Sequence, residues 1–145
     1  MPEKVPLEDA AAKSVCAALT LEGFFEDGFT AADAQELFPG GALFHYDGGE
    51  QVLREGEPGK DVFVLCSGRL AVTQFSAGMS RLLNQILPGH LFGEIGLLKD
   101  GLRSAGVVAE EVSLVFRIPR LDLQRILEAH SPLGEHLLAL SKTRK

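Results

Sequence analysis

The spacing of apolar positions changes near residue 40. From Leu7 to Leu19 apolar residues recur at about a helical spacing, which predicts a helix over residues 7–19. Thr30 followed three residues later by Asp33 resembles a capping box, and it predicts a short second helix ending near residue 38. We expect this helical segment to cover one end of the rest of the fold.

After residue 41 the pattern becomes a series of short extended runs separated by glycine, proline and asparagine or aspartate. The expected strands are residues 42–46, 51–54, 62–66, 70–75, 81–87, 106–110 and 112–118. A loose hairpin is expected at residues 76–78. About eight short strands with frequent turns predict a mainly β fold, a double-sheet roll with flanking helices.

The end of the chain returns to a helical pattern. Residues 121, 123, 126 and 127 form an apolar face after Pro119, and Ser131-Pro132 predicts an N-cap with proline at the first helical position. We interpret residues 1–40 as an N-terminal helical segment. Residues 41–145 are interpreted as a β-roll that ends in short helices, within a single compact domain.

Composition narrows the class of protein. The chain has 145 residues, of which 46% are hydrophobic and 23% charged, as expected for one globular domain rather than a disordered chain. No apolar run approaches the length of a membrane span. Cys16 and Cys66 are far apart, which favours a reduced cytoplasmic setting, and no Cys/His spacing indicates a metal site.

Charge is unevenly distributed along the chain. The net charge is −6, but residues 1–57 hold twelve acids and three bases, whereas residues 58–145 hold eight acids and eleven bases. An acidic protein is a poor candidate for sequence-independent DNA binding. No nucleophile motif, Walker-type loop or paired carboxylates are visible, so we expect no enzymatic activity and no catalytic residue.

One stretch carries the candidate chemistry, residues 92–105 (FGEIGLLKDGLRSA). A glycine entry lets backbone N–H groups approach an anion, and a following turn of helix adds partial positive charge. Arg103 can clamp a phosphate oxygen, whereas Glu94 suits a hydroxyl donor such as a sugar. Glu94 could instead stabilise the start of a helix. A phosphate and a sugar hydroxyl in one site indicate a nucleotide.

The segments 92–98 (FGEIGLL) and 103–105 (RSA) resemble the phosphate-binding cassette of cyclic nucleotide-binding domains. Residues 52–72, with their glycine punctuation, resemble the strand pair that precedes the cassette in that family, and the resemblance covers roughly residues 38–140. It implies a jelly-roll fold, also called a double-stranded β-helix. It also implies that Arg103 neutralises the cyclic phosphate and that Glu94 binds the ribose 2′-hydroxyl.

Further ligand contacts follow from the same resemblance. Gly93, Ile95 and Ala105 would offer backbone N–H groups, and Ser104 a hydroxyl, while Leu83 and Asn84 would line the base and ribose pocket. Serine at position 104 is compatible with both cyclic AMP and cyclic GMP, and we favour cyclic AMP. No other cofactor is expected. In relatives a long final helix caps the base, but only about thirteen residues follow Pro132 here.

The resulting prediction is a cytoplasmic cyclic nucleotide receptor that relays ligand binding through its flanking helices. The chain contains no DNA-binding domain, so its output would be an unidentified effector protein or self-association. The alternative is a protein-interaction module with the same fold that does not bind nucleotide. Retention of both Glu94 and Arg103 counts against that alternative, and the short final helix counts for it.

Overall fold

The computed structural model describes residues 3–25, 28–57, 61–92, 98–99, 102–103, 105–129 and 131–142. The strands are β1 (Glu3–Val5), β2 (Ala42–Tyr46), β3 (Gln51–Leu53), β4 (Val62–Ser67), β5 (Leu70–Ser76), β6 (Met79–Ile86), β7 (Leu91–Phe92), β8 (Leu98–Lys99), β9 (Leu102–Arg103), β10 (Gly106–Ala109) and β11 (Ser113–Ile118). The helices are α1 (Asp9–Leu19), the 3₁₀ turn η1 (Glu22–Phe24), α2 (Ala31–Leu37), α3 (Arg120–Glu128) and α4 (Pro132–Lys142).

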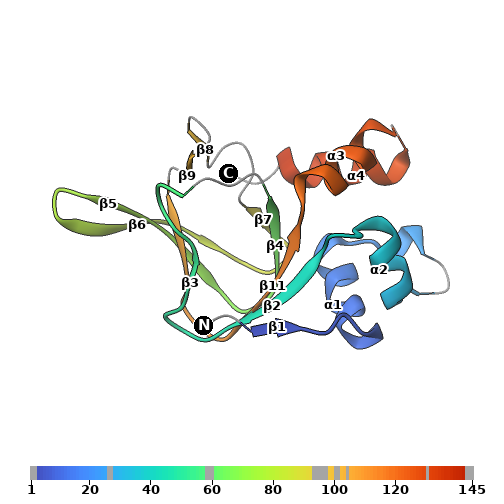
Figure 1. The fold of residues 1–145 in the computed structure, drawn as a ribbon, viewed down its shortest axis with the longest axis horizontal. Coiled ribbons are helices and arrows are strands. Elements are labelled where there is room, and N and C mark those ends of the chain that lie inside the picture. The colour runs from blue at the N-terminus through green and yellow to red at the C-terminus, as the bar shows by residue number, and fades with distance from the viewer. Residues whose placement is uncertain are drawn as a thin grey trace.

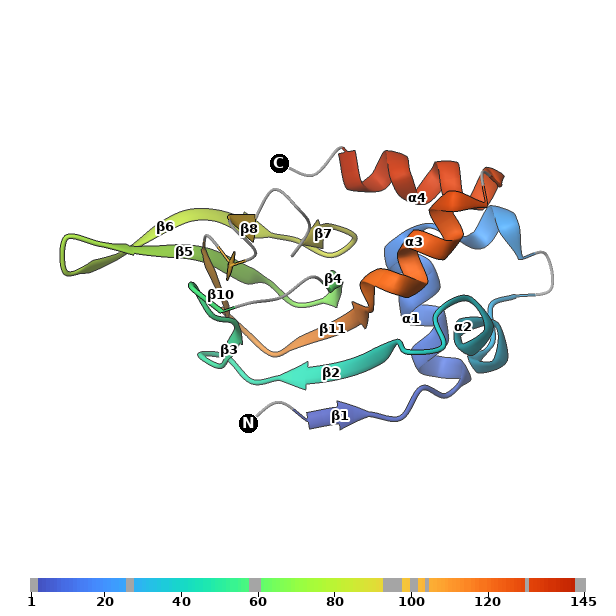
Figure 2. The ribbon, with the colours of Figure 1, turned by 45° about the horizontal axis from the view of Figure 1, so that its top comes forward.

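Two antiparallel sheets form the β-roll. The first sheet has the order β1-β2-β11-β4-β7 and the second the order β3-β10-β5-β6, while β8 and β9 pair separately. The four helices gather at one end of the roll, and the β5–β6 hairpin projects from the other (Figures 1 and 2). The predicted mainly β, jelly-roll architecture with flanking helices is confirmed.

Alternation along the central strands divides the buried side chains into two cores. In β4, Val62 and Val64 face the helices, whereas Phe63 and Leu65 face the second sheet. We call the cluster between the two sheets the inner core; its buried members are Tyr46, Leu53, Phe63, Leu65, Leu70, Val72, Ile86, Phe92, Ala105, Val107, Ala109 and Val115. Both faces of the first sheet are therefore covered, as its near-continuous apolar strands require.

The N-terminal helices form much as their sequence patterns predict. Helix α2 begins after Thr30, whose side chain accepts a hydrogen bond from Asp33 N while the Asp33 carboxylate accepts one from Thr30 N. Strand β1 was not expected, yet it pairs antiparallel with β2, and Val5 lies opposite Leu43. The division of the chain at residue 40 stays a prediction.

Polar contacts connect the C-terminal helices to the N-terminal half. The buried Asp122 carboxylate on α3 accepts a 2.8 Å hydrogen bond from Gly40 N. On α4, His136 Nε2 donates to Leu19 O at 2.9 Å, at the end of α1. The predicted N-cap is present, because Ser131 Oγ accepts from Gly134 N at 3.1 Å. The C-terminal helices therefore contact the N-terminal segment, and buried side chains of all four helices pack in one cluster with those of the first sheet.

The remaining differences from the expected elements concern short strands and one turn. Strands β7, β8 and β9 were not expected, because two-residue strands have no recognisable periodicity. Within the candidate motif at residues 92–105, residues 98–99 pair with residues 102–103 as strands. The helical turn expected at the start of that motif falls on residues 93–97, which lie outside the described residues. The loose hairpin expected at residues 76–78 is instead a tight turn, since Ser76 pairs directly with Met79.

Candidate functional site

The candidate motif starts at one sheet and ends at the other. At its start, β7 pairs with β4, and the rings of Phe92 and Phe63 stack with centroids 5.4 Å apart. At its end, Ala105 is buried in the inner core and Gly106 begins β10 in the second sheet. The stretch between residues 92 and 105 is therefore anchored at both ends by inner-core side chains that come from opposite sheets.

Strand β9 places the backbone of Arg103, the predicted phosphate ligand. Arg103 lies opposite Leu98, and Leu102 opposite Lys99, in the two-stranded β8–β9 hairpin. This hairpin lies beside the end of the roll where β7 begins the motif (Figure 2). The Arg103 side chain is outside the described part of the structure, as are Gly93, Glu94, Ile95 and Ser104, so their predicted roles remain predictions.

The other predicted site residues lie on different surfaces. Asn84 on β6 is opposite Val72 of β5, a buried inner-core residue, so Asn84 shares the face that borders the inner core. Its Oδ1 accepts a 2.8 Å hydrogen bond from Gln85 N. Leu83 is the extra residue of a bulge, since Leu82 pairs with Thr73 and Asn84 with Val72. It is exposed.

Arg117 is a cation near this region that the sequence analysis did not single out. It lies two residues after buried Val115 on β11 and so shares that residue's face, and its guanidinium lies 5.6 Å from the centroid of the Phe44 ring. Its Nε is buried with no hydrogen-bond partner among the described residues and lies 3.9 Å from Asp61 Oδ2. The available signal was a charged residue within an otherwise apolar strand pattern, at a position facing the inner core.

The hydroxyl of Tyr46, a residue of the inner core, is held in its neutral form. Tyr46 lies on the same face of the first sheet as Arg117, and burial raises the pKa of its hydroxyl. The nearby Glu50 carboxylate raises it further, whereas Arg117 acts in the opposite direction. Tyr46 is therefore protonated at neutral pH and adds no negative charge that would repel an anion.

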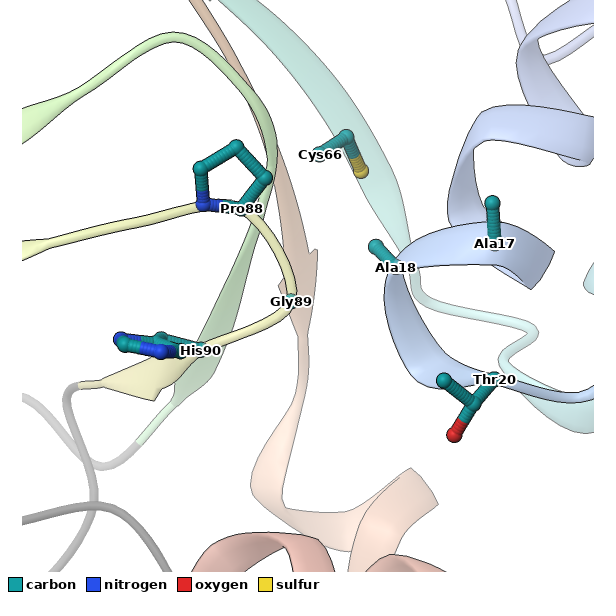
Figure 3. A pocket seen from close by; sticks show the side chains of 7 residues that line it. All are labelled: Ala17, Ala18, Thr20, Cys66, Pro88, Gly89 and His90. Carbon is teal, nitrogen blue, oxygen red and sulfur yellow. The ribbon is translucent and has the colours of Figure 1, made fainter.

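A separate cavity of about 300 Å³ lies between the end of α1 and the turn that follows β6. Figure 3 shows Cys66, Ala18 and Gly89 around this space, with the His90 ring turned away from α1. Burial raises the pKa of the Cys66 thiol to about 12, so the thiol is protonated and a poor nucleophile at neutral pH. Among the described residues that line this cavity none is Lys or Arg, which distinguishes it from the predicted anion site.

None of the described helices is long and apolar enough to cross a membrane. Within the same residues, no group of three or more His, Cys, Asp or Glu side chains could hold a metal ion.

The fold and the motif together define a ligand-binding β-roll. The sequence model of the cyclic nucleotide-binding domain family matches residues 43–130, which is more than half of the chain and includes the whole candidate motif. The chain belongs to this family. The family's domain is a binding and regulatory module rather than a catalytic one.

Individual relatives agree with this assignment. The chain is 41% identical over 69 residues to cGMP-dependent protein kinase 2 of Homo sapiens, a match covering 46% of this chain and 9% of the kinase. It is 32% identical over 101 residues to the cyclic AMP receptor protein of Thermus thermophilus, covering 69% of this chain and 46% of that protein. The chain thus spans less than half the length of either relative.

Solved structures show the same fold. A cyclic nucleotide-binding domain from Methylobacillus flagellatus superimposes with a TM-score of 0.71, covering 94% of this chain and 77% of the other, at 18% sequence identity.

Proposed function

We propose that this chain is a cyclic nucleotide receptor that prefers cyclic AMP and relays ligand binding to a partner through its flanking helices. The observation that carries the proposal is the motif at residues 92–105, which lies within the family match and joins the two sheets beside the inner core. Arg103 would neutralise the cyclic phosphate and Glu94 would accept from the ribose hydroxyl, with Gly93, Ile95, Ser104 and Ala105 completing the phosphate contacts.

The relay is supported by the contacts of the helices with the strand that enters the motif. Helix α4 contacts β7, which ends at Phe92, the first residue of the motif. The same helix is joined to the end of α1 through His136 and Leu19. A ligand that binds one arrangement of residues 93–104 more tightly would therefore bias the position of α4 and, through it, of α1.

The experiment is isothermal titration of the purified chain with cyclic AMP and with cyclic GMP. Arg103→Ala should weaken binding by roughly a hundredfold or more, because it leaves a phosphate charge without its charge-assisted partner. Arg54→Ala is the matched control, since it removes the same charge from an exposed position at the end of β3. The control should bind like the unaltered chain, and the ligand that binds more tightly sets the base preference.

Two results would contradict the proposal. Absence of binding of either nucleotide at about 1 mM, a concentration that detects even weak association, would leave the alternative of an interaction module that binds no nucleotide. Equal affinity of the Arg103→Ala and Arg54→Ala variants would show that ligand binds elsewhere. The relay is tested separately, by hydrogen exchange of the α4 amides with and without ligand, and unchanged exchange would contradict it.

A further inference from the structure

Exposed large apolar side chains are concentrated in the β5–β6 hairpin and the residue that follows it, within the described part of the chain. Of eight exposed large apolar side chains there, five lie between residues 75 and 87: Phe75, Met79, Leu82, Leu83 and Leu87. Phe75 is 58% and Leu82 59% exposed. Single exposed apolar residues are ordinary on protein surfaces, but such a concentration on one element marks an interaction site.

The pairing register places two of these side chains together. Leu82 lies opposite Thr73, and Ser80 lies opposite Phe75. Phe75 and Leu82 are therefore diagonal neighbours on the same face of the hairpin, close enough for large side chains to touch. Leu83 follows at the bulge. We call Phe75, Leu82 and Leu83 the hairpin patch.

The outer half of the hairpin has little support from the rest of the protein. Pairing of β5 with β10 ends at Thr73, so residues beyond it pair only with β6 among the described strands. One further contact is the hydrogen bond from Phe75 N to Glu55 Oε1, 2.9 Å long. β6 is itself an edge strand. A two-stranded ribbon with exposed apolar side chains is marginally stable alone and offers unpaired backbone groups to another chain.

Charge indicates which partner would fit. The chain has a net charge of −6, so two copies repel each other over most of their surface, whereas residues 70–87 contain no acid and a single base, Arg81. A strongly charged partner would find only Arg81 to pair with. An uncharged apolar patch is complementary to itself, which is what a two-fold symmetric contact between identical chains requires.

We propose that the hairpin patch is the surface through which two copies of this chain associate across a two-fold axis, with Leu82 close to the axis. The patch is smaller than the roughly 800 Å² per partner of a stable interface, so the dimer is weak, with a dissociation constant on the order of 10–100 μM. This association goes beyond nucleotide binding and does not depend on it.

Sedimentation velocity of the ligand-free chain over a range of concentrations tests the proposal. The unaltered chain should shift from monomer to dimer. Leu82→Glu and Phe75→Glu should each raise the dissociation constant roughly tenfold or more, since each places like charges near the axis and removes apolar contact from both copies. Leu121→Glu is the matched control, because Leu121 is 78% exposed and belongs to α3, which lies at the opposite end of the molecule from the tip of the hairpin (Figure 2). The control should dimerise like the unaltered chain.

A cross-linking experiment tests the geometry of the contact. Leu82→Cys should form a disulfide-linked dimer under mild oxidation, whereas Leu121→Cys should not. The native thiols provide a low background, since Cys16 is buried and the Cys66 pKa is raised to about 12. Equal cross-linking of the two variants would overturn the assignment of Leu82 to the axis.

Other results would overturn the proposal itself. A chain that stays monomeric at about 1 mM associates too weakly for this role. Dimers that Leu82→Glu and Phe75→Glu leave intact would place the contact elsewhere. A monomeric chain that binds phospholipid vesicles, and loses that binding on Leu82→Glu, would assign the hairpin patch to a membrane surface instead. Because all samples are ligand-free, none of these results depends on whether the chain binds a nucleotide.

Discussion

The two turns at the ends of β5 both contain residues with positive φ, but they lie in different surroundings. The base turn, Ser67–Arg69, joins β4 to β5 through Gly68, whose φ is +99°. The tip turn joins β5 to β6 through Ala77 and Gly78, whose φ values are +54° and +79°. Both turns require backbone conformations that glycine adopts most readily.

Packing around the two glycines is very different. A Cβ added to Gly68 would lie 2.5 Å from Val112 O and even closer to Ser113 Oγ, whereas one added to Gly78 would meet nothing within 4 Å. The base turn is also bonded to its surroundings, since Glu110 N donates to Arg69 O at 2.9 Å. Packing and turn geometry both fix the base, but turn geometry alone fixes the tip. This difference explains how the tip can present an apolar surface without disturbing the roll.

The largest expected effect is that of Gly68→Ala. The left-handed conformation costs about 1–2 kcal/mol for a residue with a Cβ, and overpacking against β11 adds about 1–3 kcal/mol, so the free energy of unfolding should fall by roughly 2–5 kcal/mol. Urea unfolding measures it. Gly78→Ala is the matched control and should cost only about 1 kcal/mol, because no neighbour obstructs its Cβ. Equal losses would mean that the base is no more constrained than the tip.

An intermediate effect is expected at high pH, from Cys66 beside the base turn. Its thiol has a pKa of about 12 in the folded protein against 9.0 when unperturbed, because burial disfavours the thiolate. Below pH 9 the thiol is protonated in both the folded and the unfolded chain, and the protein keeps its full stability. As the pH rises from 9 towards 12, the thiol ionises only in the unfolded chain, so the free energy of unfolding falls. The loss approaches about 1.4 kcal/mol per pH unit within that window.

The measurement is urea unfolding of the unaltered chain and of Cys66→Val between pH 7 and about pH 10.5, within the range where the thiol of the unfolded chain ionises. Cys66→Val should lose less stability over this range. The stability of both proteins should still fall somewhat at alkaline pH, because burial also raises the pKa of Tyr46. Superimposable pH dependences would contradict a thiol that folding keeps protonated.

Much of the fold could be predicted from the sequence because local signals agreed with tertiary packing. The capping box at Thr30, the Ser131 N-cap and the alternating strands from Ala42 to Ile118 specify their elements directly. Strand β1 could not be predicted, because three residues carry no period and pairing with β2 alone defines them. The tip turn was misjudged because Ala77 is not a residue that favours positive φ.

The candidate site was predictable only in part, for a different reason. The glycine-containing stretch with Glu94 and Arg103, and its resemblance to a phosphate-binding cassette, predict a nucleotide site, but the position of a side chain depends on how distant strands pair. Asn84 lies opposite the inner-core residue Val72, whereas Leu83 is the exposed extra residue of a bulge between Leu82 and Asn84. The sequence pattern does not indicate that bulge. Arg117 was missed for the same reason, since only the register of β11 places it facing the inner core.

The smallest expected effect distinguishes the tip from the base most directly. Ala77 has a φ of +54°, which costs a residue with a Cβ about 1–2 kcal/mol that glycine avoids. Glycine also gains entropy in the unfolded chain, which offsets about 0.4–1 kcal/mol. Ala77→Gly should therefore raise the free energy of unfolding by roughly 0.5 kcal/mol, measured as an increase in the urea midpoint.

The matched control is Ser76→Gly, one residue earlier and within β5. Ser76 has no positive φ for glycine to relieve, so this substitution should lower the urea midpoint instead. A lower midpoint for Ala77→Gly as well would mean that the positive φ at the tip is not strained. The tip would then be held by contacts beyond its own turn, contrary to the contrast with Gly68.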